Sequence, residues 1–303
     1  MKQNQSIELV HVIDQSYSPY LKIVKQSSPA TRLLTCHDLI AIRTARGDFP
    51  NAPKTSATGK RLQKWIQYSL PLADFYACDS DETQNDLNHI VPQSSNFSRV
   101  IHLGTQRNSA KSSNPKSLDP NLCFDPSEIN YLLHVGSAAW YKNRTAVLKS
   151  FFHSKNQPNG KNLKLILVGP PPQRHEINAE LSSALKRNSS DVICLVNISR
   201  ETLIHLYLHA KLLLFPSFIE GFGWPPLEAA SRGCSVITTK TGAIYDLLGD
   251  NAKYVDPGVQ DSINKAVTDE LQQRSDKDVQ VSLPNKQQCR ENYYKLYRQL
   301  LKN

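Results

Sequence analysis

Two carboxylates bracket an unusual loop in the stretch FPSFIEGFGWPPLEAAS, residues 215–231. The seven residues between Glu220 and Glu228 include two glycines and two prolines. The preceding run KLLLF predicts a strand that ends at this loop. Pro225 and Pro226 suit the start of a helix, because the amide hydrogen that proline lacks has no helical partner there. We therefore expect Glu228 in the first turn of that helix, where a carboxylate complements the positive end of the helix dipole.

That structural role does not account for Glu220, which precedes two glycines at the end of the predicted strand. An accessible helix N-terminus offers amide donors to phosphate groups. The two glutamates are able to accept hydrogen bonds from hydroxyl groups on either side of it. Together these properties predict a pocket for a sugar nucleotide.

A second strand end with possible chemistry is LLHVGSAAWYKNR, residues 132–144. Gly136 lets a ligand approach the backbone, and Lys142 places a positive charge for phosphate near the start of the next helix. Arg144 is a second candidate cation for the same phosphate. The pattern is not a Walker loop, which needs Gly-Lys-Ser/Thr, and by itself it is more typical of a surface lysine. A third strand end, where three prolines follow Gly169, predicts a rigid turn without chemistry.

Short apolar runs alternate with amphipathic segments along the chain, which predicts β-α units and parallel sheets covered on both faces. We expect an incomplete N-terminal domain at 1–104, a polar linker at 105–128, a second domain at 129–285 and a C-terminal helix at 286–303 that packs back toward the first domain. The apolar stripe of that helix is expected to contain Tyr294, Leu296, Tyr297 and Leu300. The predicted strands of the first domain are 8–13, 32–36, 75–78 and 99–103, and those of the second are 130–135, 163–168, 191–196, 211–215, 235–239 and 253–256. Helices are predicted in the first domain at 60–73 and at 80–91, the latter capped by Ser80.

Composition sets the class of protein. The 303 residues are 39% apolar and 21% charged, as in ordinary globular proteins, and no apolar run approaches the ~20 residues that a membrane-spanning helix needs. Six cysteines without a CxxC pair and the lack of an apolar signal core favour a reducing cytoplasm. The net charge of +9 favours an anionic partner, namely nucleic acid, an acidic membrane surface or a phosphorylated substrate, although a solvated basic face explains the scattered charges equally well.

Several segments resemble the retaining GT-B glycosyltransferases of the family-4 type. FPSFIEGFGWPPLEAASRGCSVITT resembles their Glu-x7-Glu signature, and VGSAAWYKN resembles their Gly-x5-Lys-Asn loop. In the first domain, TCHDL and ADFYACDSDETQNDL also resemble family segments, so that the match covers about residues 7–300 in family order. The resemblance implies two Rossmann-like parallel-sheet domains that face a cleft.

The resemblance also implies roles for individual residues. Glu220 would bind hydroxyls of the donor sugar, Glu228 the ribose, and Lys142 the leaving diphosphate. His37, in the TCHDL segment, would lie near the transferred sugar. The implied catalytic residues are His37, Lys142 and Glu220, and the implied donor-binding residues are Gly136, Ser137, Lys142, Asn143, Asn197, Glu220, Gly221, Phe222, Gly223, Leu227 and Glu228.

The function implied is transfer of a hexose, with mannose among the candidates, from a nucleotide-diphosphate sugar to a glycan or lipid-linked acceptor with retention of configuration. No metal and no cofactor beyond the donor is expected. We expect a cytoplasmic location. The basic charge is compatible with a peripheral contact to an acidic membrane surface. No nucleic-acid partner is expected, because the sequence lacks an evident interleaved aromatic and basic patch.

Family members usually begin with a strand and a glycine-rich loop, whereas the first glycine here is Gly47. We therefore expect a first domain that lacks about three β-α units. This leaves a second hypothesis open, in which the protein is a catalytically degenerate nucleotide-sugar-binding or interaction protein.

Overall fold

The computed structural model describes residues 7–105, 119, 122, 124–273, 281 and 283–302. Its contacts divide the chain into two units. The first comprises Met1–Arg107, Glu220–Phe222 and Pro284–Asn303, and the second comprises Asn108–Ile219 and Gly223–Leu283. Most of the predicted linker, 105–128, lies outside the described residues.

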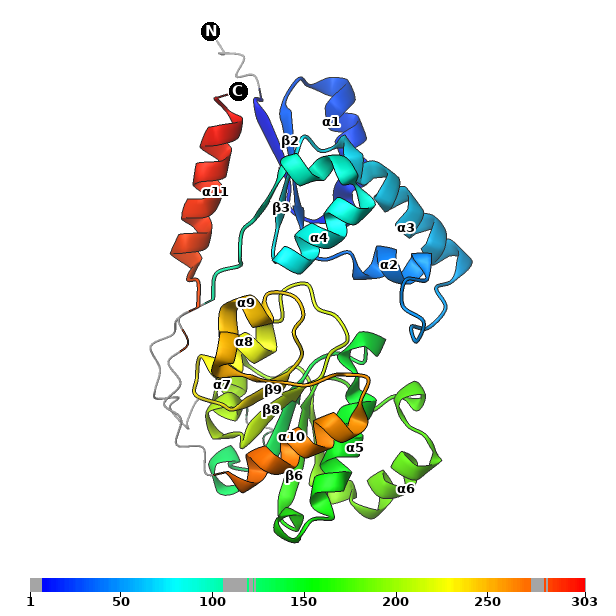
Figure 1. Ribbon diagram of the computed structural model, residues 1–303, viewed down its shortest axis with the longest axis vertical. Coiled ribbons are helices and arrows are strands. Elements are labelled where there is room, and N and C mark those ends of the chain that lie inside the picture. Colours follow the sequence, from blue (N-terminus) through cyan, green and yellow to red (C-terminus); the bar gives the residue numbers. More distant parts are fainter. Residues whose placement is uncertain are drawn as a thin grey trace. The chain divides into compact units, whose positions relative to one another are not determined.

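The first unit is built on a parallel sheet of four strands in the order β1-β2-β3-β4 (Figure 1). Each connection between successive strands carries a helix, as parallel pairing requires. Among the described strands β1 pairs only with β2, so it is an edge strand. The elements are β1 (Leu9–Val12), the 3-10 helix η1 (Gln15–Tyr20), α1 (Leu21–Ser27), β2 (Thr31–Cys36), α2 (Ile40–Arg46), α3 (Ala57–Ser69), β3 (Phe75–Cys78), α4 (Asp81–Ile90) and β4 (Ser98–Val100).

Helices α1 to α4 cover one face of this sheet. Leu34 and Tyr76 of the strands pack there against Leu21 of α1 and Ile66 of α3. Helix α4 begins at the predicted cap, since Ser80 accepts a hydrogen bond from the backbone amide of the third helical residue at 3.1 Å. Burial of these apolar side chains fixes the helices on the sheet.

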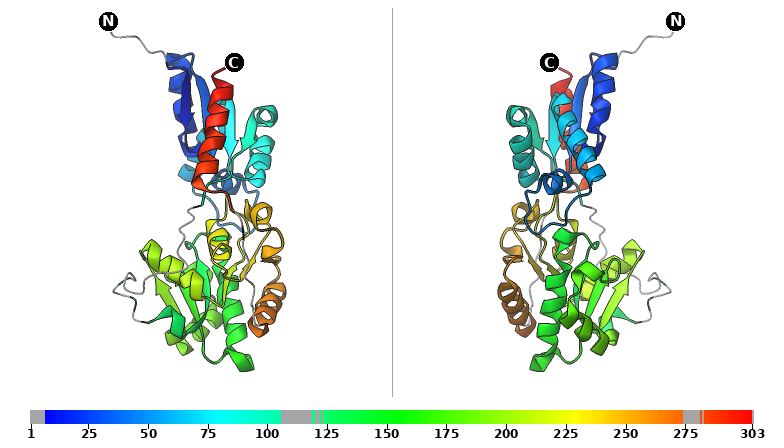
Figure 2. Two further views of the ribbon diagram at one scale, coloured as in Figure 1. Left: turned by 90° about the vertical axis from the view of Figure 1, so that its left-hand side faces the viewer. Right: turned by 90° about the vertical axis from the view of Figure 1, so that its right-hand side faces the viewer.

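The other face is covered by α11 (Lys286–Leu300), which lies beside the first sheet although it comes from the end of the chain (Figures 1 and 2). Leu296 is fully buried against Leu33 of β2. The predicted apolar stripe is wrong at one position, because Tyr294 is 56% exposed whereas Tyr293 packs in this core. At about 3.6 residues per turn, Tyr293 shares the face of Leu296 and Tyr294 is turned away from it.

The second unit is built on a parallel sheet of six strands in the order β10-β9-β8-β5-β6-β7. Phe151 of α5 and Val267 of α10 are fully buried on it, and these two helices lie side by side (Figure 2). The strands are β5 (Asn130–Val135), β6 (Leu163–Val168), β7 (Val192–Leu195), β8 (Leu212–Phe215), β9 (Val236–Thr238) and β10 (Lys253–Tyr254), and the helices are α5 (Arg144–Lys155), α6 (Ala179–Arg187), α7 (Arg200–His209), α8 (Trp224–Ala230), α9 (Ile244–Leu248) and α10 (Gln260–Gln272).

The predicted fold class, α/β with two parallel Rossmann-like sheets, is confirmed. The ten predicted strands all occur, and those of the second sheet begin and end within two residues of the prediction. Within the described ranges no helix combines the length and the apolarity needed to cross a bilayer.

Candidate functional site

The strand order of the second sheet contains a switch point between β5 and β8. From β5 the chain proceeds outward through β6 and β7, and it then returns to the other side of β5 for β8, β9 and β10. The connections that follow β5 and β8 therefore run to opposite sides of this strand pair, which is the topology of a switch point. Ligands of open α/β sheets bind at such switch points. Both motifs singled out in the sequence, around Lys142 and around Glu228, follow these two strands.

The two loops are tied together by direct contacts. The amide of Phe218 donates a hydrogen bond to the carbonyl of Tyr141 at 2.8 Å, and the rings of Trp140 and Phe218 stack with centroids 6.2 Å apart. The side-chain amide of Asn143 donates to the carbonyls of Pro216 at 3.1 Å and Pro257 at 2.9 Å. Asn143 reaches both because it adopts a left-handed conformation with φ of 52°.

Lys142 lies at the centre of this arrangement. Its ammonium is 4.9 Å from the ring centroid of Phe215, the last residue of β8, and 5.2 Å from that of Tyr141. The faces of aromatic rings attract a cation, so these rings help to hold the charge at the carboxyl ends of β5 and β8. This placement suits an anion such as a diphosphate.

Arg144 has a different role from the one considered above. Its side chain is only 1% exposed and pairs with the buried Glu176, with Nε and Oε1 3.3 Å apart, and it donates to the carbonyl of Pro170 at 2.7 Å. Because Glu176 balances its charge, Arg144 adds no net charge to the loop. It joins the start of α5 to the proline turn after β6, and the second-cation interpretation is wrong.

The proline turn supports the Gly136 loop. Gly169 has φ of 146°, and a Cβ there would lie 2.1 Å from the carbonyl oxygen of Gly136. Only glycine allows this approach of the two backbones. The predicted turn therefore packs closely against the β5 loop and sets the position of Gly136.

Helix α8 begins one residue earlier than expected. Gly223 is its N-cap with φ of 89°, and a Cβ there would meet Ile244 at 2.3 Å. The helix therefore starts at Trp224, and the prolines fill the next two positions. Glu228 is the fifth helical residue and lies outside the first turn, so the predicted placement at the helix start is wrong. Leu227 is fully buried.

The carboxylate of Glu228 lies between two side chains of α7. The hydroxyl of the buried Tyr207 donates to it over a long 3.4 Å, and the guanidinium of Arg200 is 3.7 Å away. Side-chain exposure of Glu228 is 21%, so part of the side chain is accessible. Tyr207 and Arg200 were not identified in the sequence, where their distance from the motif hides the contact.

Two of the implied donor-binding residues lie at the margin of this arrangement. Ser137 is exposed on the β5 loop, where its hydroxyl accepts a weak hydrogen bond from the amide of Ala139 at 3.4 Å. Asn197 is exposed and adopts a φ of 54° in the loop after β7. Strand β7 is an edge strand of the second sheet and lies two strands away from β5. The structure therefore brings Gly136, Lys142 and Asn143 together with residues 215–218, the start of the segment that leads to α8, and Asn197 stands apart.

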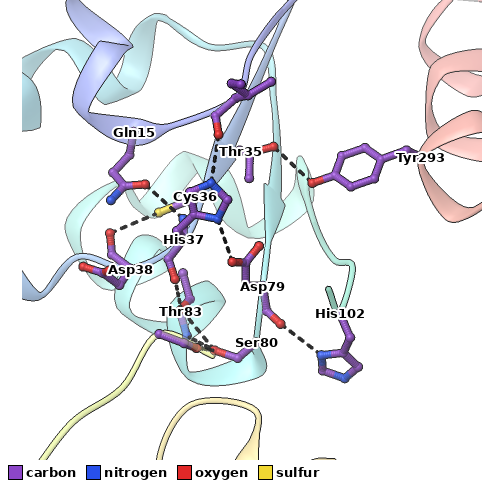
Figure 3. A network of polar contacts seen from close by, with 12 residues as sticks. Gln15, Thr35, Cys36, His37, Asp38, Asp79, Ser80, Thr83, His102 and Tyr293 are labelled. Carbon is purple, nitrogen blue, oxygen red and sulfur yellow. Dashed lines mark hydrogen bonds and ion pairs between the residues drawn. The ribbon is translucent and has the colours of Figure 1, made fainter. Parts of the chain in front are cut away.

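His37 belongs to the first unit and follows β2 (Figure 3). Its Nδ1 is 2.6 Å from the buried carboxylate of Asp79, and its Nε2 is 2.9 Å from the carbonyl of Ile13. Both partners are acceptors, so both ring nitrogens carry hydrogen. The hydrogen bond to Asp79 raises the pKa of His37 to about 9, which makes it an imidazolium at neutral pH.

The contacts of Glu220, Gly221 and Phe222 group these residues with the first unit as well. Glu220 and Phe222 are buried, with 7% and 5% exposure. They lie on the segment between β8 and α8. The implied site residues are thus distributed over both units.

His134 was not identified in the sequence, although it is the one polar residue in the apolar part of its strand. Its Nδ1 donates to the carbonyl of Leu214 at 2.9 Å, and its Nε2 lies 3.2 Å from where a Cβ of Gly136 would be. Burial lowers the pKa of His134 to about 3, so the ring is neutral and its Nε2 carries no hydrogen. No described residue hydrogen-bonds that nitrogen. A neutral ring at this position adds no further positive charge beside Lys142.

Comparison with known proteins agrees with this architecture. Residues 124–295, more than half of the chain, match the family model described as "Glycosyl transferases group 1". The chain is 25% identical over 250 residues to the serotype-specific mannosyltransferase WbdA of Escherichia coli, a match that covers 78% of this chain and 29% of that protein. It is 29% identical over 143 residues to the O-antigen chain mannosyltransferase RfbU of Salmonella typhimurium, covering 46% of this chain and 37% of that protein.

Solved structures share the fold over nearly the whole chain. The sucrose-phosphate synthase of Thermosynechococcus elongatus superposes with a TM-score of 0.71 at 20% identity, covering 96% of this chain and 73% of that one. A UDP-forming trehalose-phosphate synthase of Burkholderia xenovorans superposes with a TM-score of 0.69 at 12% identity, covering 97% and 73%. The protein has the GT-B fold and belongs to the group 1 glycosyl transferases.

Proposed function

We propose that this protein transfers a hexosyl group from a nucleotide-diphosphate sugar to a glycan or lipid-linked acceptor, with retention of configuration. The observation that carries the proposal is the placement of Lys142 at the switch point of the second sheet, on a loop tied to the segment after β8. The names of the relatives WbdA and RfbU make mannose the preferred sugar, and therefore GDP-mannose the first donor to test.

Each residue has a role in this reaction. The bond between the anomeric carbon and the diphosphate oxygen breaks, and negative charge develops on the diphosphate beside Lys142, which stabilises it. The acceptor oxygen bonds to the same face of the sugar, and its proton passes to the leaving diphosphate. Glu228 accepts hydrogen bonds from the ribose, and Glu220 accepts them from hydroxyls of the transferred sugar. His37, whose two ring N–H groups donate to Asp79 and Ile13, is proposed to lie near that sugar.

Binding of the nucleotide is the first test. Isothermal titration of the full chain with GDP and UDP should show binding to at least one of them. Lys142→Ala should weaken that binding about tenfold to a hundredfold, because a hydrogen bond to a charged group contributes roughly 1.5–3 kcal/mol. Lys211→Ala removes the same charge at the amino end of β8 and should leave the affinity unchanged.

Transfer is the second test. Donor hydrolysis and transfer from GDP-mannose to a glycan or lipid-linked acceptor are measured for the native chain and for Glu220→Ala. Lack of binding to any nucleoside diphosphate refutes the proposal altogether. Nucleotide binding without hydrolysis or transfer to any tested acceptor favours the second hypothesis, a degenerate binding protein.

A further inference from the structure

We propose that the outward side of η1, α1 and α3 in the first unit is a docking surface for an anionic phospholipid bilayer. This interfacial surface is defined by six exposed apolar side chains and five basic ones around them. Its apolar members are Tyr17, Tyr20, Ile23, Leu62, Trp65 and Tyr68, with exposed fractions of 56%, 60%, 61%, 48%, 61% and 69%. Soluble proteins seldom gather this many large apolar side chains on one surface without a partner.

The three elements present these side chains on one side of the sheet. Leu21 of α1 and Ile66 of α3 are buried in the same core over the same sheet face, so the outward sides of both helices point away from that face. The hydroxyl of Ser18 in η1 donates to the carbonyl of Ile66 at 3.0 Å, which joins η1 to α3. The rings of Tyr17 and Tyr20 are 6.2 Å apart. Figure 2 shows α1 and α3 on the side of the first sheet that faces away from α11.

The charge on this surface has one sign. Residues 15–30 and 52–73 contain no Asp or Glu. The acids that flank these segments are engaged, since Asp14 caps η1 and Asp74 pairs with Arg32. The basic members of the surface are Lys22, Lys25, Lys60, Arg61 and Lys64, all of them exposed. A surface that is uniformly basic and apolar complements anionic headgroups above a hydrocarbon boundary.

The mixture of side chains favours a bilayer over other anionic partners. Trp and Tyr are the residues that settle at the headgroup level of membranes. The ammonium of Lys64 lies 5.6 Å from the ring centroid of Tyr68, so its stem runs along apolar surface while its head is available to a phosphate. Ile23 and Leu62 offer no π-face for stacking on nucleic-acid bases. A second copy of the chain would bring two basic surfaces together, and like charges repel.

This surface corrects an expectation from the sequence, which was that no interleaved aromatic and basic patch exists. The run KRLQKWIQYS contains one once it forms α3, because about 3.6 residues per turn bring Arg61, Lys64, Trp65 and Tyr68 to adjacent outward positions.

Vesicle co-sedimentation tests the proposal, and it does not depend on the proposed enzymatic activity. The full chain should bind vesicles of phosphatidylcholine mixed with phosphatidylglycerol and not vesicles of phosphatidylcholine alone, and added salt should weaken the binding. The triple variant Lys60→Gln/Arg61→Gln/Lys64→Gln should bind on the order of a hundredfold more weakly, at about 1 kcal/mol per basic residue. Trp65→Ala/Tyr68→Ala should weaken binding while preserving its dependence on salt.

The matched control is Lys186→Gln/Arg187→Gln on α6, which removes two exposed charges of the second unit and should leave vesicle binding unchanged. Circular dichroism melting shows whether each variant remains folded. The proposal is overturned if the native chain does not bind anionic vesicles, or if the α6 control loses binding as much as the α3 variant. It is equally overturned if the α3 variant changes only the oligomeric state or the affinity for single-stranded RNA.

Discussion

Arg144 and Lys142 are two residues apart, and the structure assigns them opposite roles. Replacing Arg144 with Met removes one partner of a buried pair and leaves Glu176, which is 6% exposed, without its counter-charge. Breaking such pairs costs roughly 3–5 kcal/mol. Since the pair has a single contact at 3.3 Å and is not bidentate, we expect the lower end, about 3 kcal/mol. For a unit of this size that lowers Tm by about 6–12 °C.

The measurement is urea and thermal denaturation of the full chain, followed by tryptophan fluorescence and circular dichroism. Trp140 and Trp224 both belong to the second unit and report on it. Arg144→Met/Glu176→Met should recover most of the lost stability, because a buried ion pair replaced by apolar side chains is close to neutral. Lys142→Ala should leave stability nearly unchanged and weaken nucleotide binding.

One outcome would refute this assignment. If Arg144→Met lowers the free energy of unfolding by less than about 1 kcal/mol and weakens nucleotide binding as much as Lys142→Ala does, then Arg144 faces the ligand and the buried pair is not formed in solution.

Three further predictions concern backbone geometry and protonation. Gly169→Ala should destabilise the second unit by about 1–3 kcal/mol and weaken nucleotide binding in titration calorimetry, because the new Cβ strains the backbone and displaces Gly136. Asn143→Ala should cost about 1–2 kcal/mol more in urea denaturation than Asn143→Gly, since both lose the side-chain hydrogen bonds and only alanine is strained at φ of 52°. His37→Gln should destabilise the first unit most near about pH 6, and the charge-dependent part of the difference from the native chain should vanish above about pH 9. The raised pKa of His37 means that its stabilisation is complete below the unfolded pKa and is lost as pH rises through about 9.

The controls separate these causes. Gly233→Ala also places alanine at positive φ, 77°, but its Cβ meets nothing within 4 Å, so it should destabilise without changing nucleotide binding. Equal loss of affinity in both glycine variants would contradict the role assigned to Gly169. A constant stability difference for His37→Gln between about pH 6 and about pH 10 would contradict its charged state.

The sequence by itself determined the class of fold and most of its elements. Doubly buried parallel strands appear as uninterrupted apolar runs, so β5 and β6 begin and end at the predicted residues. Local chemistry also sufficed for the cap at Ser80 and, to within one residue, for the start of α8 at the glycine-proline segment. These features depend on neighbours within a few positions, which the sequence displays directly.

Only the tertiary structure decided which strand ends meet and which charges are buried. Strand order is set by side-chain packing between segments far apart in the chain, so neither the switch point between β5 and β8 nor the contact of Tyr207 with Glu228 is visible in the sequence. Lys142 and Arg144 look alike as basic residues at a helix start. Burial beside Glu176 makes Arg144 a structural residue, whereas Lys142 is held over Phe215 at the carboxyl ends of the strands. Spacing alone does not distinguish them, because desolvation depends on the full set of atoms that surround a charge.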